Sequence, residues 1–143
     1  MALDPDIWGP HYWFVLHTIS LTYPTNPNDV TKKKYYDFIQ NIPLFLPSQT
    51  IGNKFSKYLD MYPVTPYLDS RESFIKWVNF IHNKVNISIG KEELTLTDSM
   101  TKYYENYKPK EIIMRENIKN KQQIIFATLL VILTITIIYL YKK

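Results

Sequence analysis

The feature that most constrains this chain is a long apolar run near its C-terminal end. Residues 124–141 are apolar except for three threonines, whose hydroxyl groups can bond back to helix carbonyl groups. About 18 residues rise roughly 27 Å as a helix, close to the hydrocarbon thickness of a bilayer. Lysines and interfacial aromatic residues flank the run: Lys119, Lys121, Lys142, Lys143, Tyr139 and Tyr141. The run has no amphipathic pattern, so the sequence predicts a transmembrane helix over residues 124–141 rather than a buried core helix.

The N-terminal end has none of the features of a secretory signal. Residues 1–7 carry Asp4 and Asp6 but no basic residue, and no continuous apolar stretch follows them. The expectation is a single-pass, tail-anchored membrane protein with its domain on the cytosolic side. Lysines on both flanks of the apolar run leave the orientation undecided by charge alone.

The composition restricts what the rest of the chain can be. A chain of 143 residues that is 45% hydrophobic, with 3 Trp, 12 Tyr and 7 Phe, has material for one compact domain and an appendage. The net charge of +4 is not concentrated in a basic stripe, so nucleic acid is not an expected partner. Only 3 glycines occur, which excludes glycine-rich phosphate loops. Any bound nucleotide must be held by side chains and helices.

Proline residues and helical periodicity divide the domain into helices. The predicted helices run from Pro10 to Tyr23, from an N-cap at Asn28 to Gln40, from near Ser48 to before Pro63, from an N-cap at Asp69 or Ser70 to Gly90, and from Thr97 or Asp98 to Tyr107. This pattern predicts an all-α fold, a four-helix bundle with a short fifth helix over residues 1–108. A charged linker, residues 109–123, is expected between the bundle and the transmembrane helix. Cofactor sites in such bundles form between facing helices.

The polar residues of the domain favour a ligand site over a metal site. The chain has no cysteine, and His11, His17 and His82 are too scattered to predict a metal centre, so no metal site is expected. His82, with Asn86 four residues later, lies on one helix face beside an apolar stripe. That face would suit a flat aromatic ligand with polar edges.

Two motifs on separate predicted helices point to a known family. Trp8-Gly9-Pro10, Trp13 and Leu16-His17 stand in the first helix, and His82-Asn83-x-Val85-Asn86 followed by Gly90-Lys91 in the fourth. Over about residues 6–107 the chain resembles the Erv/ALR family of FAD-linked sulfhydryl oxidases. The resemblance implies a bundle that binds FAD. The residues implied to contact FAD are Gly9, Trp13, His17, His82, Asn83, Val85, Asn86, Lys91 and Tyr104, with Lys91 suited to the pyrophosphate.

The third helix departs from the family pattern at its redox site. The family reads Leu-Pro-Cys-x-x-Cys-Arg-x-His-Phe, and this chain has Ser48 and Ile51 in place of the two cysteines, Gly52 in place of Arg, and Lys54 in place of His. Active members pass electrons from a thiolate to the flavin and then to dioxygen. Serine has no accessible two-electron couple of this kind, and isoleucine has none at all. No catalytic pair is therefore intact.

Two functions follow from this combination. The sequence favours a flavin-binding, membrane-anchored and catalytically degenerate family member that acts through association. The alternative is a residual flavin-dependent thiol oxidase that supports disulfide formation with thiols supplied by a partner. The resemblance implies dimerisation through the first helices, as a homodimer or as a heterodimer with an active paralogue. The Asn-, Lys-, Tyr- and Ile-rich composition is typical of a viral protein, which suggests a virion or host membrane.

Overall fold

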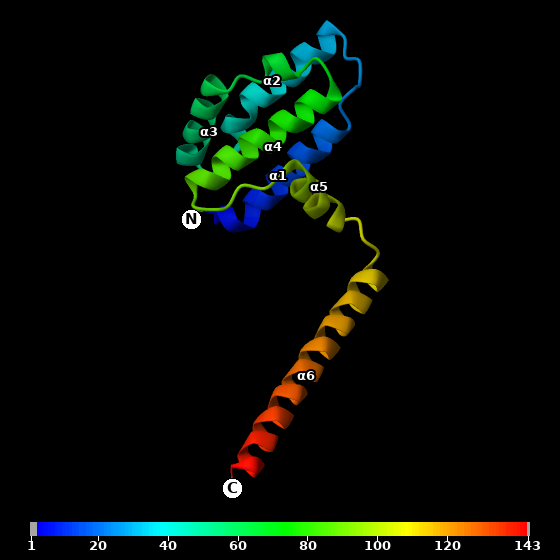
Figure 1. Ribbon diagram of the computed structural model, residues 1–143. Coiled ribbons are helices and arrows are strands. Elements are labelled where there is room, and N and C mark those ends of the chain that lie inside the picture. The colour runs from blue at the N-terminus through cyan, green and yellow to red at the C-terminus, as the bar shows by residue number, and fades with distance from the viewer. Residues whose placement is uncertain (1–2, 143) are drawn as a thin grey trace. The chain divides into compact units, whose positions relative to one another are not determined.

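The computed structural model describes residues 3–142, apart from the side chain of Ile113. The chain divides into two compact units, one ending at Tyr103 and the other beginning at Tyr104 (Figure 1). Apart from one short 3₁₀ turn, the regular elements in residues 3–142 are α-helices. The all-α prediction is confirmed.

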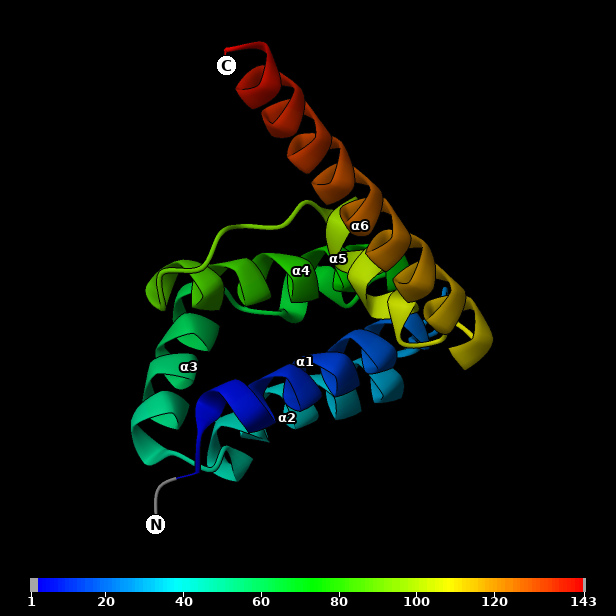
Figure 2. The same ribbon diagram turned by 90° about the horizontal axis from the view of Figure 1, so that it is seen from below.

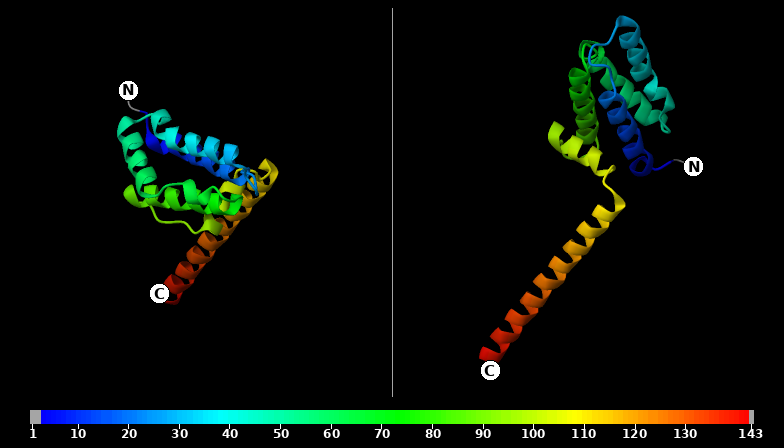
Figure 3. Two further views of the ribbon diagram at one scale, coloured as in Figure 1. Left: turned by 90° about the horizontal axis from the view of Figure 1, so that it is seen from above. Right: turned by 90° about the vertical axis from the view of Figure 1, so that its right-hand side faces the viewer.

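The first unit contains the predicted four-helix bundle and most of a fifth helix. Its elements are α1 (Pro5–Leu21), α2 (Asp29–Phe45), α3 (Gln49–Met61), a 3₁₀ turn η1 (Thr65–Tyr67), α4 (Arg71–Ser88) and α5 (Leu96–Glu105). α1 packs along α4, α3 follows α2 at a steep angle and contacts it (Figure 2), and α3 also contacts α4. Figure 2 and Figure 3 show this arrangement from below, from above and from one side. The two motif-bearing helices, α1 and α4, are therefore neighbours.

Two prolines that were expected to mark helix limits lie inside helices. α1 begins at Pro5, five residues before the predicted start, because the Asp4 side chain caps it by accepting the N–H of Asp6 at 2.9 Å. Pro10 thus lies in the helix interior and not in its first turn. α2 continues past Gln40 through Pro43 to Phe45. Burial of Ile42 holds this last turn against the core.

The remaining helix limits follow side-chain caps, and most match the prediction. Asn28 caps α2 as expected, and Ser70, one of the two expected candidates, caps α4. α3 begins next to Ser48 as expected, and the Ser48 side chain is its cap. α4 ends at Ser88, and Gly90 follows with a φ of 74°, a conformation that favours glycine. The prediction of Thr97 or Asp98 as the cap of α5 was wrong. Thr95 takes that place, since its hydroxyl oxygen accepts the N–H of Asp98 at 3.1 Å and its hydroxyl donates to the Asp98 carboxylate at 2.7 Å.

An aromatic core holds the bundle together. Tyr23, Phe74 and Trp77 are almost fully buried, and the Tyr23 and Phe74 rings meet edge-on at 5.1 Å. Their polar atoms are paired: the Tyr23 hydroxyl donates to the Leu68 carbonyl at 2.8 Å, and Trp77 Nε1 donates to the Tyr62 carbonyl at 3.1 Å. Buried Tyr and Trp are stable only with such partners. The core therefore fixes the positions of α1 and α4 without covalent cross-links.

The second unit consists mainly of one helix, α6 (Lys110–Tyr141). The charged segment 110–123, expected as a linker, is helical and continuous with the apolar run. In the described part of the chain, α6 is the one helix long and apolar enough to cross a membrane; its most apolar 18-residue window has a mean hydropathy of 2.6, and no part of that window is buried. Thr128, Thr134 and Thr136 each donate their hydroxyl to a carbonyl of the preceding turn, as expected for an apolar helix.

Candidate functional site

Three aromatic side chains of the predicted set meet between α1 and α4. The rings of Trp13 and His82 lie nearly parallel, with centroids 4.0 Å apart and an interplanar angle of 10°. His17, one turn further along α1, has Nε2 3.2 Å from His82 Nδ1. The four-residue step from Trp13 to His17 places both on the same face of α1. The structure thus joins the two motifs into one aromatic cluster, Trp13, His17 and His82.

The two imidazoles of this cluster are uncharged at neutral pH. Burial lowers the pKa of His17 to about 4. Burial also lowers the pKa of His82 to about 3, with further contributions from the neighbouring charges of His17, Lys102 and Lys91. Because a neutral imidazole has one donor and one acceptor nitrogen, one ring donates its hydrogen to the other. His17 Nδ1 is buried and has no hydrogen-bond partner among the described residues, which leaves it able to bond a polar ligand atom.

The other predicted residues of α4 have differing surroundings. Asn86 is buried, and Val85 is partly buried against the core. The Asn83 amide is engaged by the chain itself: Nδ2 donates to the Leu94 carbonyl at 2.8 Å, and Oδ1 accepts the Leu94 N–H at 3.0 Å. Lys91 lies beyond the end of α4, and its ammonium group reaches the Asp6 carboxylate of α1 at 3.2 Å. Both side chains of that ion pair are largely exposed.

Gly9 and Tyr104 are the remaining members of the predicted set. A Cβ atom at Gly9 would meet nothing within 4 Å, so this part of α1 offers space for a close approach. Tyr104 is exposed and belongs to the second unit, so its contact with a cofactor stays a prediction. Its neighbour Tyr103 is buried, with its hydroxyl 2.9 Å from that of Thr18.

Tyr103 is a further residue of this region, and the sequence motifs do not indicate it. Its ring stacks on Phe14 at 5.1 Å and lies 6.4 Å from His17. Ser99 and Tyr103, four residues apart, are the buried residues of α5 and define its inner face. Tyr103 therefore places α5 beside the aromatic cluster.

Ser48, at the first of the two expected cysteine positions, and Gly52, next to the second, have structural roles. Ser48 caps α3, its Oγ accepting the N–H of Ile51 at 3.4 Å. Gly52 lies against the end of α2, where a Cβ atom would be 2.5 Å from the Pro43 carbonyl oxygen. Phe55, one turn further, is buried with its ring edge-on to Trp13 at 6.1 Å. α3 thus contacts the aromatic cluster, and neither Ser48 nor Ile51 offers a group that can be oxidised.

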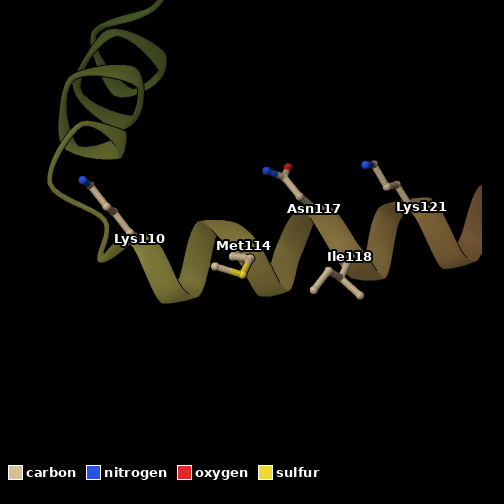
Figure 4. A pocket seen from close by; sticks show the side chains of 5 residues that line it. All are labelled: Lys110, Met114, Asn117, Ile118 and Lys121. Atoms are coloured by element: carbon tan, nitrogen blue, oxygen red, sulfur yellow. The ribbon is translucent and has the colours of Figure 1, made fainter.

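A shallow hollow follows one side of α6, in the segment before the apolar run (Figure 4). It is lined by Lys110, Met114, Asn117, Ile118 and Lys121. These residues recur at intervals of three and four and all belong to α6, so the hollow is a stripe along one helix and not an enclosed site. None of the predicted cofactor residues lines it. Within residues 3–142, no three His, Asp or Glu side chains gather in a way that could hold a metal ion.

Comparisons with known proteins agree on one family. The sequence model described as the Erv1 / Alr family matches residues 10–108. The chain is 34% identical over 110 residues to a probable FAD-linked sulfhydryl oxidase of Acanthamoeba polyphaga mimivirus, covering 76% of this chain and 77% of that protein. It is 30% identical over 89 residues to a mitochondrial FAD-linked sulfhydryl oxidase of Schizosaccharomyces pombe, covering 61% of this chain and 49% of that protein.

Solved structures give the same result for the fold. The FAD binding domain of Erv1 from Saccharomyces cerevisiae superposes with a TM-score of 0.65 and 25% identity, covering 72% of this chain and 96% of that chain. The yeast Erv1 core superposes with a TM-score of 0.64 and 26% identity, covering 71% and 84%. Both superpositions leave more than a quarter of this chain uncovered.

Proposed function

This chain belongs to the Erv1/Alr family, and from that premise we propose that it is a membrane-anchored, FAD-binding member that acts by association rather than by thiol oxidation. The observation that carries the proposal is the combination of a preserved aromatic cluster with lost redox residues. Trp13, His17 and His82 converge from two helices, whereas Ser48 and Ile51 stand at the cysteine positions.

The cluster fits a flat aromatic cofactor. Trp13 and His82 supply flat aromatic rings in nearly parallel orientation, and His17 Nδ1 is a buried polar atom without a partner among the described residues. The neutral imidazoles place no charge beneath a ring system, and the open space at Gly9 would allow close approach. When bound, a flavin supplies a two-electron acceptor. This chain's own residues would hold it, with Lys91 at the pyrophosphate and the predicted contacts of Val85 and Asn86 on α4.

The loss of catalysis follows from the residues at the start of α3. A thiol oxidase needs a thiolate that can attack the flavin and a second thiol that closes the disulfide. The Ser48 hydroxyl is engaged as a helix cap, and Ile51 is apolar. No electron pair can therefore reach a bound flavin from this chain's own residues by the family's route. Thiols of a partner would be the only source, which is the alternative function.

Anchoring through α6 is the second part of the proposal. An exposed helix window of mean hydropathy 2.6 is unfavourable in water and favourable in a bilayer. Basic residues precede it at Lys108, Lys110, Arg115, Lys119 and Lys121 and follow it at Lys142 and Lys143, so both ends are suited to a membrane interface. A cytosolic domain is part of the proposal and does not follow from these charges. A virion or host membrane would be the setting if the protein is viral, like the mimivirus relative.

Association through α1 is the third part. Ile7, His11 and Val15 are spaced four residues apart on one face of α1, and all three are exposed. This face supports pairing with a second copy or with an active paralogue. Replacing Val15 by Lys should convert a dimer of the detergent-solubilised chain into a monomer in sedimentation analysis. An unchanged mass would refute pairing through this face.

The deciding experiment is the absorbance spectrum of the full chain purified in detergent. Bound FAD should give the two bands of an oxidised flavin, and replacing His82 and Asn86 by Ala should abolish them. A colourless protein that gains no thermal stability from added FAD would refute cofactor binding, because a ligand at about one hundred times its Kd adds roughly 2.7 kcal/mol. Oxygen consumption with added dithiol distinguishes the degenerate protein from the residual oxidase. Turnover by the unaltered chain would establish the alternative.

A further inference from the structure

The segment that joins α4 to α5, residues 89–95, is fastened to α4 at both of its ends. At its start, the Asn86 carbonyl accepts the N–H of Lys91 at 2.9 Å, across the turn formed by Gly90. At its end, the Asn83 side chain makes both hydrogen bonds of the Leu94 backbone. Figure 2 shows the segment running back along α4 towards α5. The backbone in between contains no regular structure.

Asn79 adds a third bond to the same point. Its Nδ2 donates to the Leu94 carbonyl at 3.4 Å from one turn earlier on α4. Asn79 is only 8% exposed, and its Oδ1 has no hydrogen-bond partner among the described residues. A buried acceptor without a partner is unfavourable, and an apolar side chain at this position would avoid it. The hydrogen bond to the Leu94 carbonyl is therefore the contribution that asparagine makes at position 79 and an apolar residue could not.

We propose that Asn79 and Asn83 form a clamp on Leu94 that holds residues 89–95 in place and thereby positions Lys91 for an anionic ligand. The Lys91 backbone is itself the first fastened point, three residues before Leu94, and its ammonium group already reaches α1 at Asp6. The ligand, the pyrophosphate of FAD, rests on the proposed function; the clamp itself does not. Asn83 is then a positioning residue that acts through Lys91, in place of the direct cofactor contact that the family resemblance implies.

The physical reason for a clamp is the chain entropy of this segment. An irregular segment without side-chain anchors samples many conformations, and ordering it on ligand binding would reduce affinity. Two amide side chains on successive turns of α4 fix one backbone residue through its N–H and its carbonyl group. The start of α5 at Leu96 is only two residues beyond that point. The clamp therefore also fixes where α5 begins.

The first test measures hydrogen exchange of the Leu94 amide in the full, ligand-free chain in detergent. Asn83→Ala removes both bonds from Asn83 and should lower protection of this amide by about tenfold or more. Asn83→Asp keeps the volume and the acceptor for the Leu94 N–H but loses the donor, so it should give a smaller loss in a chain that still folds. The matched control is Asn41→Ala, which removes an exposed asparagine bond to the Asp37 carbonyl within α2. Unchanged Leu94 protection in both Asn83 variants would overturn the clamp.

The second test is a double-mutant cycle on FAD affinity, read by flavin fluorescence in a titration. If Asn83 acts through Lys91, Asn83→Ala and Lys91→Met each weaken binding by about tenfold, and the double variant binds no worse than Lys91→Met alone. If the double variant instead loses FAD affinity by the product of the two single losses, Asn83 contacts the cofactor independently of Lys91, and the positioning role is overturned. A chain that shows the Leu94 effect but binds no FAD would refute the proposed function and leave the clamp standing.

Discussion

Gly52 gives the sharpest test of the structure, because two substitutions of the same kind should have opposite effects on stability. A Cβ atom at Gly52 would lie 2.5 Å from the Pro43 carbonyl oxygen, and this oxygen belongs to the backbone of α2. A flexible side chain could move aside, but here α2 and α3 must separate. At Gly9, in α1, a Cβ atom would meet nothing within 4 Å. Gly52→Ala and Gly9→Ala therefore differ only in their surroundings.

The expected changes in the free energy of unfolding combine two effects: the gain from replacing a helical glycine by alanine, which applies at both positions, and a packing cost, which applies only at Gly52. Replacing a helical glycine by alanine is worth about 0.5–1 kcal/mol in favour of the folded state, because the unfolded chain loses conformational freedom. Gly9→Ala should show this gain in the ligand-free protein. At Gly52, forcing an extra carbon into a packed contact costs about 1–3 kcal/mol, which exceeds the gain. Gly52→Ala should thus lower the free energy of unfolding by roughly 1–2 kcal/mol, or lower the Tm by roughly 4–16 °C.

Tryptophan fluorescence is the suitable assay. All three tryptophans, Trp8, Trp13 and Trp77, lie in the bundle, so their emission in a urea titration reports the bundle and not α6. The full chain is kept in detergent throughout. Equal stabilisation by both alanines would show that α2 and α3 do not approach closely at Gly52. Destabilisation by Gly9→Ala would show that the space beside Gly9 is filled in solution.

Three further changes should affect acid stability, catalysis and membrane attachment. Since the folded pKa values of His17 and His82 lie at about 4 and 3, below the ordinary 6.5, the unfolded chain takes up protons first. The contribution of the two uncharged imidazoles to the free energy of unfolding is fully present above about pH 6.5. It should fall as the pH drops towards 4, by up to about 1.4 kcal/mol per pH unit for each ring. In urea titrations at several pH values, His17→Phe should make this fall less steep. Ser48→Cys combined with Ile51→Cys should restore some dithiol-dependent peroxide formation above that of free FAD, whereas activity in the unaltered chain would contradict the degenerate site. Deleting residues 124–143 should move the protein to the soluble fraction, and continued pelleting in alkaline carbonate would point to another anchor.

The sequence predicts the helices well where a side chain caps them and less well where proline was used as a boundary. Asn28 was predicted as a cap, and Ser70 as one of two candidates, because a polar cap before an apolar run is a local signal. Pro10 and Pro43 misled the prediction because tertiary packing can hold a proline inside a helix. The helical state of the segment before the apolar run was missed because its charges resemble a linker.

The sequence indicated which residues form the aromatic cluster, but not the hydrogen bonds that surround it. Motif spacing placed Trp13, His17 and His82 on facing helices, and the structure brings them together. The bonds from Asn83 to Leu94 could not be predicted, because they depend on the path of the loop after α4. For the same reason Tyr103 was overlooked in favour of its neighbour, since the rotation of a short helix is fixed only by its packing.

Two of the residues that depart from the family's redox motif, Ser48 and Gly52, have structural roles in this chain. In the active family the first cysteine stands where this chain has the N-cap of α3, and a serine at an N-cap stabilises a helix by about 1 kcal/mol. The family's arginine stands where α2 now approaches so closely that only glycine fits. Ser48 and Gly52 therefore serve the start and the packing of α3, which keeps Phe55 against the aromatic cluster. Selection for a stable cofactor-binding fold without selection for thiol chemistry would produce this pattern. Restoring two cysteines alone should consequently recover only part of an enzyme, because the backbone at Gly52 leaves no space for the third residue.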